Sequence, residues 1–514
     1  MTRSSSPFDN DLVRLLRSSG PCLTIALIAE MVKAGLSPAA ARQRIARAGD
    51  SVTRLAGLRF AHNARFFFLS EQFGRPSFWK AIEKACKSHG PSYWGAIIGL
   101  KARGGAFPLR LFPGLCGAPL ARKGQLSPER IIERLQAIHM VEQITDEASG
   151  ERFVVFQPPQ YRTAKISHIR AQLAAEDVVL HGMKEWCRRL GLASFERIRL
   201  RNDEEPPVVS SITWDFSGPS YARPLAQPLK GTLRPGFIVA DVNLGKILDS
   251  NEVAHFVRKH DLASGPRNVA PIMPFLVADG FTATGFSLAR QKGVLATTTA
   301  QMFGEEVAKA LRDLINLLSN AGATAAVNPE HLERVMGSLT KIEGAAHNLR
   351  GHLFELAVGA LVKDVEGGFL RAGDELKEFR TGRAAEIDVL LDRPDDKGVL
   401  VIECKSKSPT SRIGLPEIQK WREDRVPLLR SILRSRSSFA DKKLTFELWT
   451  NAPIAGAELE WLENHRSEEG CEIGWRDGEA MKAYLEKSTS KSLIKIMNEH
   501  YFRHALVRVI PSQQ

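Results

Sequence analysis

Long apolar runs are absent from this sequence, and cysteines are few. No uninterrupted apolar stretch approaches the roughly 18 to 20 residues that a membrane-spanning helix requires, and the polar start, 1–10, lacks the apolar core of a secretory signal. The six cysteines lie far apart without a CxxC pair, which argues against a structural zinc site and for reduced thiols. We therefore expect a soluble, cytoplasmic protein without a membrane partner.

Several familiar catalytic signatures are absent as well. The sequence contains no phosphate-binding loop of the Walker type, no G-x-S-x-G nucleophile elbow and no H-E-x-x-H zinc motif. The sequence therefore gives no support for an ATPase motor, a serine hydrolase of the α/β type or a zinc peptidase.

Acidic residues are the scarcer charge. The chain has 71 Lys and Arg against 58 Asp and Glu, a net charge of +13. Residues 1–160 alone hold 22 basic and 12 acidic residues, which gives +10 and places most of the excess in the first third. A basic block favours a nucleic-acid partner, because neutralising phosphates releases counterions. An ordinary solvated surface explains the same charge and stays open as an alternative.

At 514 residues, the chain is long enough for three or four domains with cores of their own. Its hydrophobic content of 43% and charged content of 25% are ordinary for a globular protein. The pattern of helical and β-prone segments predicts a multidomain fold that combines α+β and α/β parts. We predict domains at 1–72, 73–160, 161–320 and 321–514.

The first domain shows a pattern typical of a winged helix-turn-helix. Gly20 and Gly35 end two helical runs, and Ser37 and Pro38 supply the cap and first turn of a third helix, 38–48. Two β-prone stretches follow and indicate a wing. This arrangement makes helix 38–48 the candidate for the DNA major groove.

Five basic residues of this domain are the predicted DNA contacts. They lie on the third helix and in or beside the wing, where a winged helix meets the groove and the backbone. Folds of this kind also serve as protein-interaction modules, and that alternative stays open. The predicted DNA-binding residues are Arg42, Arg44, Arg47, Arg54 and Arg59.

The same pattern recurs in 73–160 and predicts a second winged-helix-like domain. Helical runs at 78–88 and 93–101 precede a third that begins at Ser127 and Pro128. Two β-prone segments around 146–151 indicate a hairpin wing. Tandem winged helices would give a longer DNA footprint than one.

The stretch from Glu386 to Lys405 carries the most informative chemistry. Two short aliphatic runs flank a turn rich in Pro, Asp and Gly, which is a strong hairpin signal. Because side chains alternate along a strand, Glu403 and Lys405 share a face, and the paired strand brings Asp388 close to them. Two carboxylates with a lysine are the groups that a Mg²⁺-dependent phosphodiesterase uses.

A helix predicted at 345–365 precedes this hairpin and carries Glu355 among apolar residues. A buried carboxylate is costly unless it is paired or lies near a cation, so Glu355 is a further candidate. A partly exposed or hydrogen-bonded Glu is the alternative. Glu386 shares the face of Asp388 and is a possible additional ligand.

These elements together resemble the PD-(D/E)XK nuclease superfamily, in particular Mrr-like and other restriction-endonuclease-like proteins. The resemblance covers about 345–480 and rests on Glu355, on Asp388 in the second strand and on the Glu403-Cys404-Lys405 triplet in the third. It implies that Asp388, Glu403 and Glu355 bind Mg²⁺ or Mn²⁺, and that Lys405 assists the attacking water or the charged transition state. Gln419 on the following helix would be an accessory catalytic group.

The middle domain, 161–320, has a similar order of elements but lacks the chemistry. Its strand–helix–strand segment 274–294 resembles the rear part of Mrr-like nucleases. Asp215 and Asp241 match the two acids, yet Asn243 stands where the lysine would be. The resemblance implies a degenerate, inactive nuclease-like domain. An unrelated α/β domain and a migrated lysine at Lys246 remain as alternatives.

Taken together, the sequence predicts a metal-dependent DNA endonuclease of restriction, phage defence or repair. A DNA-binding regulator with a vestigial nuclease fold is one alternative, and a structure-specific nuclease or RNase is another. The resemblance makes a homodimer plausible, because cutting both strands often takes two sites. The sequence contains no pattern that identifies a partner protein.

Overall fold

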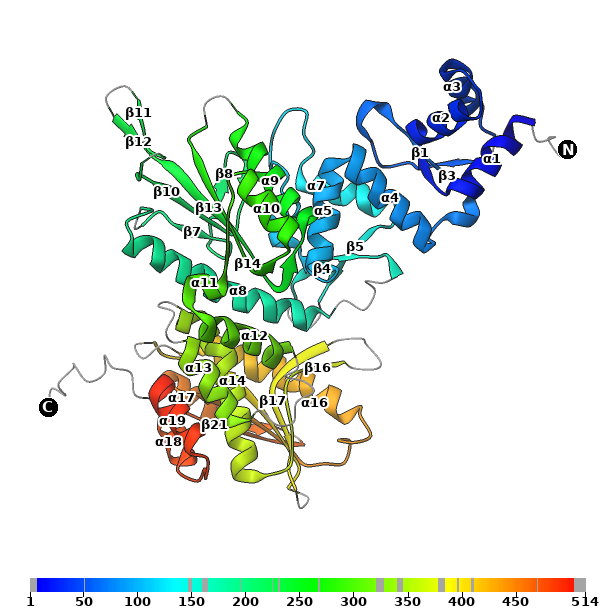
Figure 1. Ribbon diagram of the computed structural model, residues 1–514. Coiled ribbons are helices and arrows are strands. Elements are labelled where there is room, and N and C mark those ends of the chain that lie inside the picture. The colour runs from blue at the N-terminus through cyan, green and yellow to red at the C-terminus, as the bar shows by residue number, and fades with distance from the viewer. Residues whose placement is uncertain are drawn as a thin grey trace.

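Two lobes joined by a layer of helices make up the chain in the computed structural model, which mixes helices with several small sheets (Figure 1). None of the helices within the described residues is long and apolar enough to span a membrane. The predicted domain boundaries near 160 and 320 fall outside the described residues. The structure describes residues 7–49, 51–146, 150–159, 165–194, 196–223, 225–229, 232–266, 269–319, 328–339, 345–377, 384–394, 397–407, 411–468 and 470–502.

The first group of elements contains the three helices and the small sheet that the sequence predicts. Ser37 Oγ accepts a hydrogen bond from the amide of Ala40 at 3.2 Å, and Pro38 begins the third helix. Leu16, Leu27 and Phe67 belong to its core. The elements are α1 (Pro7–Ser19), β1 (Cys22–Leu23), α2 (Thr24–Lys33), α3 (Pro38–Ala46), β2 (Thr53–Arg54) and β3 (Phe66–Phe68), with sheet order β1-β3-β2.

The second group also has the predicted helices and hairpin. One further helix, α6, lies in the Pro- and Gly-rich segment 105–126. The elements are α4 (Pro76–His89), α5 (Pro91–Ala102), β4 (Ala106–Pro108), α6 (Phe112–Cys116), α7 (Pro128–Ala137), β5 (Val141–Thr145) and β6 (Arg152–Phe156), with sheet order β4-β6-β5.

The third group is a five-stranded sheet of order β15-β14-β13-β10-β7 behind a long leading helix, α8. Its elements are α8 (Ile166–Arg189), β7 (Arg199–Leu200), β8 (Val208–Val209), β9 (Ile212–Thr213), β10 (Phe216–Ser220), β11 (Gln227–Leu229), β12 (Thr232–Arg234), β13 (Gly236–Leu248), α9 (Ser250–Ser264), β14 (Ile272–Phe281), α10 (Ala283–Gln291) and β15 (Leu295–Thr298).

A short hairpin and one longer strand precede β13 in this group. The segment 208–215 is not a single strand but a tight hairpin, β8 and β9, because Ser210 and Ser211 adopt positive φ angles of 52° and 65°. The central antiparallel strand is instead β10, which pairs with β13 and places Phe216 opposite Ala240. Asp215 therefore lies immediately before a strand rather than at the end of one.

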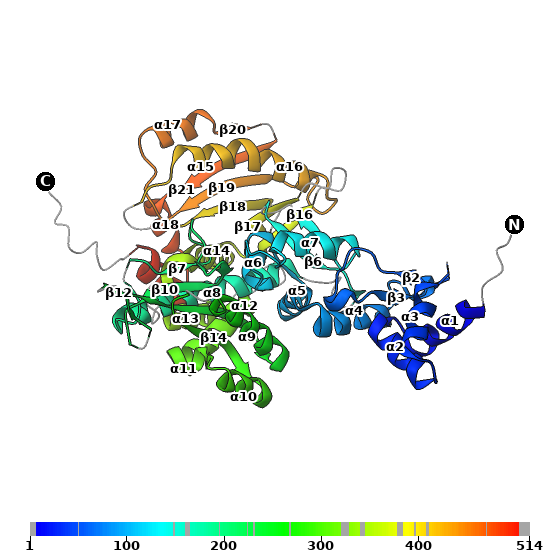
Figure 2. The same cartoon turned by 90° about the horizontal axis from the view of Figure 1, so that it is seen from above.

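The fourth group carries the predicted hairpin within a sheet of order β16-β17-β18-β19-β21-β20. Figure 2 shows α15, α16 and α17 on one side of this sheet. Its strands are β16 (Phe369–Lys377), β17 (Ala384–Asp392), β18 (Val399–Lys405), β19 (Leu444–Thr450), β20 (Ser467–Glu468) and β21 (Cys471–Arg476). Its helices are α14 (Ala345–Glu366), α15 (Leu415–Gln419), α16 (Val426–Arg434), α17 (Ala457–Asn464), α18 (Gly478–Leu485) and α19 (Lys491–Ile496), with π-helical turns at Lys420–Arg425 and Met497–Phe502.

The third and fourth groups share a strand topology. In each, a leading helix precedes two antiparallel pairings followed by two parallel ones: β7-β10-β13-β14-β15 in one and β16-β17-β18-β19-β21 in the other. A helix connects each parallel pair. The chain thus contains two copies of one arrangement of strands.

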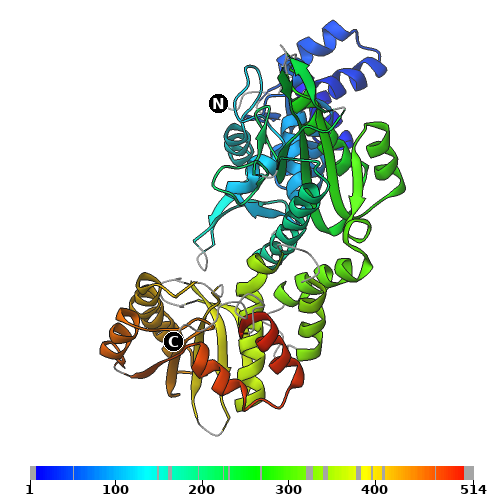
Figure 3. The ribbon, with the colours of Figure 1, turned by 90° about the vertical axis from the view of Figure 1, so that its left-hand side faces the viewer.

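A continuous apolar core joins the two copies. The leading helices α8 and α14 pack against each other, together with α12 (Glu305–Ser319) and α13 (Pro329–Leu339). The short helix α11 (Thr299–Phe303) precedes this layer. Val179, Leu314, Leu361 and Ile402 belong to one buried cluster that spans both sheets. Figure 3 shows the lobes from the side, with the helical layer between them.

Candidate active site

The two strands of the predicted hairpin place the two acids side by side. β17 and β18 are antiparallel, and Val389 pairs with Ile402. Asp388 and Glu403 are the next residues along the two strands, so they lie side by side. The amide of Cys404 donates a hydrogen bond of 2.7 Å to Asp388 Oδ2. This bond fixes the orientation of the Asp388 carboxylate toward the end of β18.

Glu403 and Lys405 share a face of β18, as the period of the strand predicts. Lys405 Nζ lies 2.8 Å from Glu403 Oε1, and the side chain of Glu403 is only 4% exposed. Burial lowers the pKa of Lys405, but the charge of Glu403 and its hydrogen bond outweigh burial, and the pKa is raised. Lys405 is therefore a charged donor at neutral pH.

Three carboxylates converge on this region without full charge compensation. Burial raises the pKa of Asp388 well above its usual range, and the charges of Glu403 and Glu355 raise it further. Glu355 lies on α14 and is partly exposed, with Oε2 3.7 Å from His352 Nδ1. A cluster of this kind favours an added cation, because a cation stabilises the ionised carboxylates.

His352 joins the cluster of carboxylates as the partner of Glu355. Its hydrogen bond to Glu355 raises the pKa of the imidazole, and the charges of Glu355 and Glu386 act in the same direction. The structure thus connects to the site a residue that the sequence pattern did not select.

Arg425 is the basic residue of the site that sequence reasoning missed. Its Nε lies 3.1 Å from Glu403 Oε2, and its Nη2 donates a hydrogen bond of 2.6 Å to the carbonyl oxygen of Glu386. Arg425 ends the π-helical turn between α15 and α16. A π turn adds a residue to the helical repeat, so ordinary helical periodicity does not indicate which face Arg425 occupies.

Gln419 is the remaining residue of the predicted catalytic set. It ends α15, and among the described residues its side chain makes no hydrogen bond to Asp388, Glu403 or Lys405. The sequence-predicted residues that the structure brings together are therefore Asp388, Glu403, Lys405 and Glu355.

Asp388 and Glu403 have the chemistry to hold a magnesium ion. Within the described residues, no set of three His, Cys, Asp or Glu side chains surrounds a common metal position. Mg²⁺ is usually held by one or two carboxylates, with water and phosphate oxygens completing its octahedron. Two buried carboxylates at adjacent strand positions meet that requirement. Glu355 would act through a metal-bound water.

A helix of the other copy reaches the rim of this site. Arg170 on α8 lies 3.7 Å from Glu386 Oε2, and it also pairs with Asp146, which follows β5. The guanidinium of Arg170 therefore connects Asp146 of the second group of elements to Glu386 at the candidate site.

The middle copy has the same two acids in the same hydrogen-bonded arrangement. The amide of Val242 donates a bond of 2.9 Å to Asp215 Oδ2, as the amide of Cys404 does to Asp388. Asp215 therefore matches Asp388, and Asp241 matches Glu403. By the same alignment, Asn243 occupies the position of Lys405, as the sequence predicted.

Internal cations neutralise the acids of the middle copy. Lys259 Nζ lies 2.5 Å from Asp241 Oδ2, and Arg201 Nη1 lies 3.7 Å from Asp215 Oδ1. Glu176 on α8 is fully buried between Arg201 and Arg103. Lys246, the possible migrated lysine, pairs instead with Glu252.

The second group of elements covers this middle site. Arg103, which follows α5, donates a bond of 2.7 Å to the carbonyl of Val242. Lys259 donates to the carbonyl of Gly114 at 2.9 Å, and His255 Nε2 lies 2.8 Å from the carbonyl oxygen of Leu115. The cavity that remains measures about 70 Å³.

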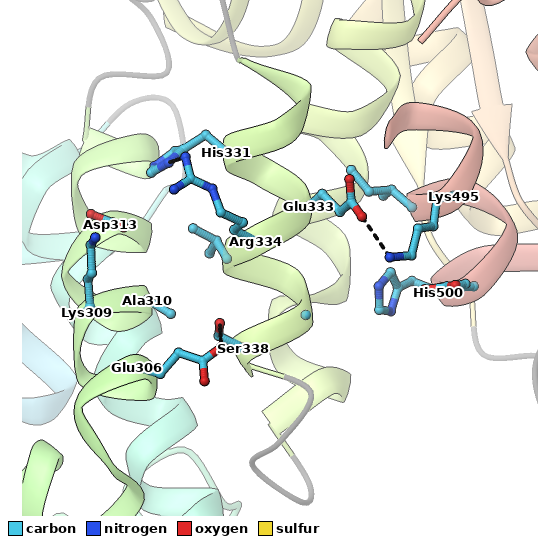
Figure 4. Close-up of a pocket in the computed structure, with 14 residues that line it drawn as sticks. Glu306, Lys309, Ala310, Asp313, His331, Glu333, Arg334, Ser338, Lys495 and His500 are labelled. Carbon is cyan, nitrogen blue, oxygen red and sulfur yellow. Dashed lines mark hydrogen bonds and ion pairs between the residues drawn. The ribbon is translucent and has the colours of Figure 1, made fainter. Parts of the chain in front are cut away.

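A larger cavity of about 400 Å³ lies between α12, α13 and the final helices, away from both acid pairs (Figure 4). Its lining mixes acids and bases, and these pair with one another. Lys495 lies 2.8 Å from Glu333, and Ser338 donates to Glu306 at 3.2 Å. No single charge dominates the lining, so the cavity does not resemble an anion or cation site.

Four of the five predicted DNA-binding arginines are exposed. Arg42 and Arg47 lie on and at the end of α3, Arg54 lies in β2, and Arg59 follows it. Arg44 differs, because its Nη1 lies 3.1 Å from Asp11. The exposed guanidiniums are thus available on one helix and its neighbouring strand.

Comparison with models of known protein families and with curated protein sequences gives no match for this chain.

Proposed function

We propose that this protein is a metal-dependent DNA endonuclease whose active site is the acid–lysine cluster on β17 and β18. In this proposal the fourth group of elements is a catalytic core of the PD-(D/E)XK type and the third group an inactive copy. The first two groups are winged helix-turn-helix domains. A role in restriction, phage defence or DNA repair is consistent with a DNA-recruiting part joined to a cutting part.

One observation carries the proposal: Asp388, Glu403 and Lys405 meet across two paired strands, with Glu355 nearby. Buried carboxylates that share a site are costly to the fold, so their retention is better explained by chemistry than by stability.

The middle copy strengthens the argument by contrast. It keeps two acids but has Asn243 in place of the lysine, and its acids are paired with Lys259 and Arg201. In the C-terminal copy, Lys405 and Arg425 are each 30% exposed. The cations that pair with the middle acids are buried instead, with Lys259 1% and Arg201 2% exposed.

The residues of the C-terminal site have complementary roles in this proposal. Asp388 and Glu403 would hold Mg²⁺, which supplies an activated water and offsets charge on the phosphate. Lys405, held protonated beside Glu403, donates to the attacking water or to the oxygens that gain charge. The hydrogen bond from the amide of Cys404 orients the Asp388 carboxylate. Glu355 would help to position the metal.

The exposed arginines of the first group supply affinity for the DNA backbone. Arg42 and Arg47 on α3, with Arg54 on β2, would contact phosphates or groove edges. This assignment agrees with the excess of basic residues in 1–160.

A DNA-binding regulator with a vestigial nuclease fold is the second candidate, and one observation favours it. Both carboxylate oxygens of Glu403 are paired with cations, Lys405 and Arg425. Under that alternative the two cations would replace the metal permanently. Metal binding by the full chain separates the two candidates.

Cleavage assays on the full-length protein test the proposal. Plasmid, linear duplex, single-stranded DNA and RNA are incubated with Mg²⁺, Mn²⁺ or EDTA. The proposal predicts cleavage of DNA with Mg²⁺ or Mn²⁺ and its loss in Lys405→Ala. Metal-independent cleavage, or full activity in Lys405→Ala, would show that the site is misassigned.

A further inference from the structure

The carboxylate of Glu403 holds two cations at once. Its Oε1 lies 2.8 Å from Lys405 Nζ, and its Oε2 lies 3.1 Å from Arg425 Nε. A divalent ion that binds Glu403 needs one of these oxygens. Each oxygen has two lone pairs and could bind a metal while it accepts a hydrogen bond, but repulsion between the metal and the two cations favours the movement of one of them.

Arg425 is built to move without leaving the site. Its Nη2 is anchored to the carbonyl of Glu386 at 2.6 Å, while its Nε contacts Glu403. A guanidinium has five N–H donors in a planar fork, so it can keep one contact and redirect the others. Phosphate oxygens match that fork in a bidentate manner.

The middle copy has a cation in the equivalent position that is buried. Lys259, on the helix after the third strand, contacts Asp241 as Arg425 contacts Glu403. Lys259 is 1% exposed and is also bound to the carbonyl of Gly114. The C-terminal site differs in that its helix-borne cation is partly exposed to solvent.

From these contacts we infer that Arg425 is a phosphate-binding residue that occupies Glu403 until a divalent cation replaces it. With the metal bound to Glu403, the guanidinium turns from Glu403 to a DNA phosphate at the site while Glu386 keeps it in place. The inference deepens the proposed nuclease function and rests on it.

Replacement of Arg425 should change metal binding and DNA cleavage in opposite directions, which a purely structural role would not do. Arg425→Ala removes a cation that competes for Glu403, so Mn²⁺ should bind the DNA-free protein about tenfold more tightly. The same variant should cleave DNA about 10- to 100-fold more slowly at saturating Mn²⁺, because a phosphate contact is lost. The Mn²⁺ affinity and the cleavage rate of Arg425→Lys should each lie between those of the wild type and those of Arg425→Ala. Damage to the fold would instead weaken both Mn²⁺ binding and cleavage.

Titration calorimetry or electron paramagnetic resonance with Mn²⁺, and single-turnover cleavage of a duplex, give the two readouts. Lys420→Ala, an exposed lysine of the same turn, is the matched control and should leave both unchanged. Weaker or unchanged Mn²⁺ binding in Arg425→Ala would overturn the inference, and so would an unchanged cleavage rate. The proposed function itself fails under different results: the wild type does not cleave DNA, and Asp388→Asn binds Mn²⁺ as tightly as the wild type does.

Discussion

Lys405 Nζ lies 2.8 Å from Glu403 Oε1, on one face of a strand whose neighbour carries Asp388. The ammonium group is thereby held charged at the position where a nuclease needs a donor. In the matching strand of the middle copy, Asn243 follows Asp241 with the same spacing. The two copies therefore differ at this position and also in the cations that pair with their acids, which are Lys405 and Arg425 in one copy and Lys259 and Arg201 in the other.

Replacement of Lys405 tests its catalytic role. Lys405→Ala should lower the cleavage rate by about 100-fold or more, which is typical when a donor to the developing charge is removed. The measurement is single-turnover cleavage at saturating Mg²⁺. Thermal unfolding provides the control, since Arg425 still neutralises Glu403 and the fold should survive. A rate within about threefold of the wild type would contradict the assignment.

Replacement of Arg103 tests whether its contacts at the middle site stabilise the packing of the second group of elements against the third. Arg103→Met leaves the fully buried Glu176 with one fewer cation, and breaking such a pair costs about 3–5 kcal/mol. We expect a lower midpoint in denaturant or heat, with the specific cleavage rate of the remaining folded protein unchanged. Arg130→Met, at an exposed ion pair, is the control and should shift the midpoint little. Equal stability of the two variants would argue against the role.

Acid should weaken the contact between the second and third groups through His255. Burial lowers the pKa of this imidazole to about 4 from its usual 6.5. A depressed folded-state pKa means that its contribution is full above pH 6.5 and is lost as pH falls through 4. The difference corresponds to about 3 kcal/mol between these limits. Unfolding curves across this window should be less pH-dependent in His255→Gln, and an identical dependence would contradict the prediction.

The DNA-binding assignment is tested by salt dependence. In Arg42→Ala/Arg47→Ala, affinity for duplex DNA should fall across all sequences, and the slope of log K against log salt should shrink by about 1 for each lost phosphate contact. Arg44→Ala is the comparison, because Arg44 already pairs with Asp11 and should contribute less. An unchanged slope in the double variant would remove α3 from the DNA interface.

Much of the fold could be predicted because its signals are local. The hairpin of β17 and β18 has aliphatic runs around a turn of Pro, Asp and Gly, and α3 begins with a Ser cap followed by Pro. β10 could not be predicted in this way. It contains Gly218 and Pro219, which disfavour strands in isolation, and its pairing with β13 compensates for them.

The candidate site was predictable to a similar extent. Asp388, Glu403 and Lys405 follow from strand alternation and hairpin pairing, which depend on short-range spacing. Arg425 does not, because it lies twenty-two residues beyond Glu403 and on a π-helical turn. The covering of the middle site by Arg103 depends on contacts between distant segments, which no local pattern encodes.

The central claim is that metal-dependent cleavage occurs at the acid pair of β17 and β18. Cleavage of plasmid DNA by the full chain, with and without Asp388→Asn and with Mg²⁺ or EDTA, tests it most directly. The account predicts cleavage by the wild type in Mg²⁺, none in EDTA and none by Asp388→Asn under either condition. Mg²⁺-dependent cleavage by Asp388→Asn at the wild-type rate would contradict it.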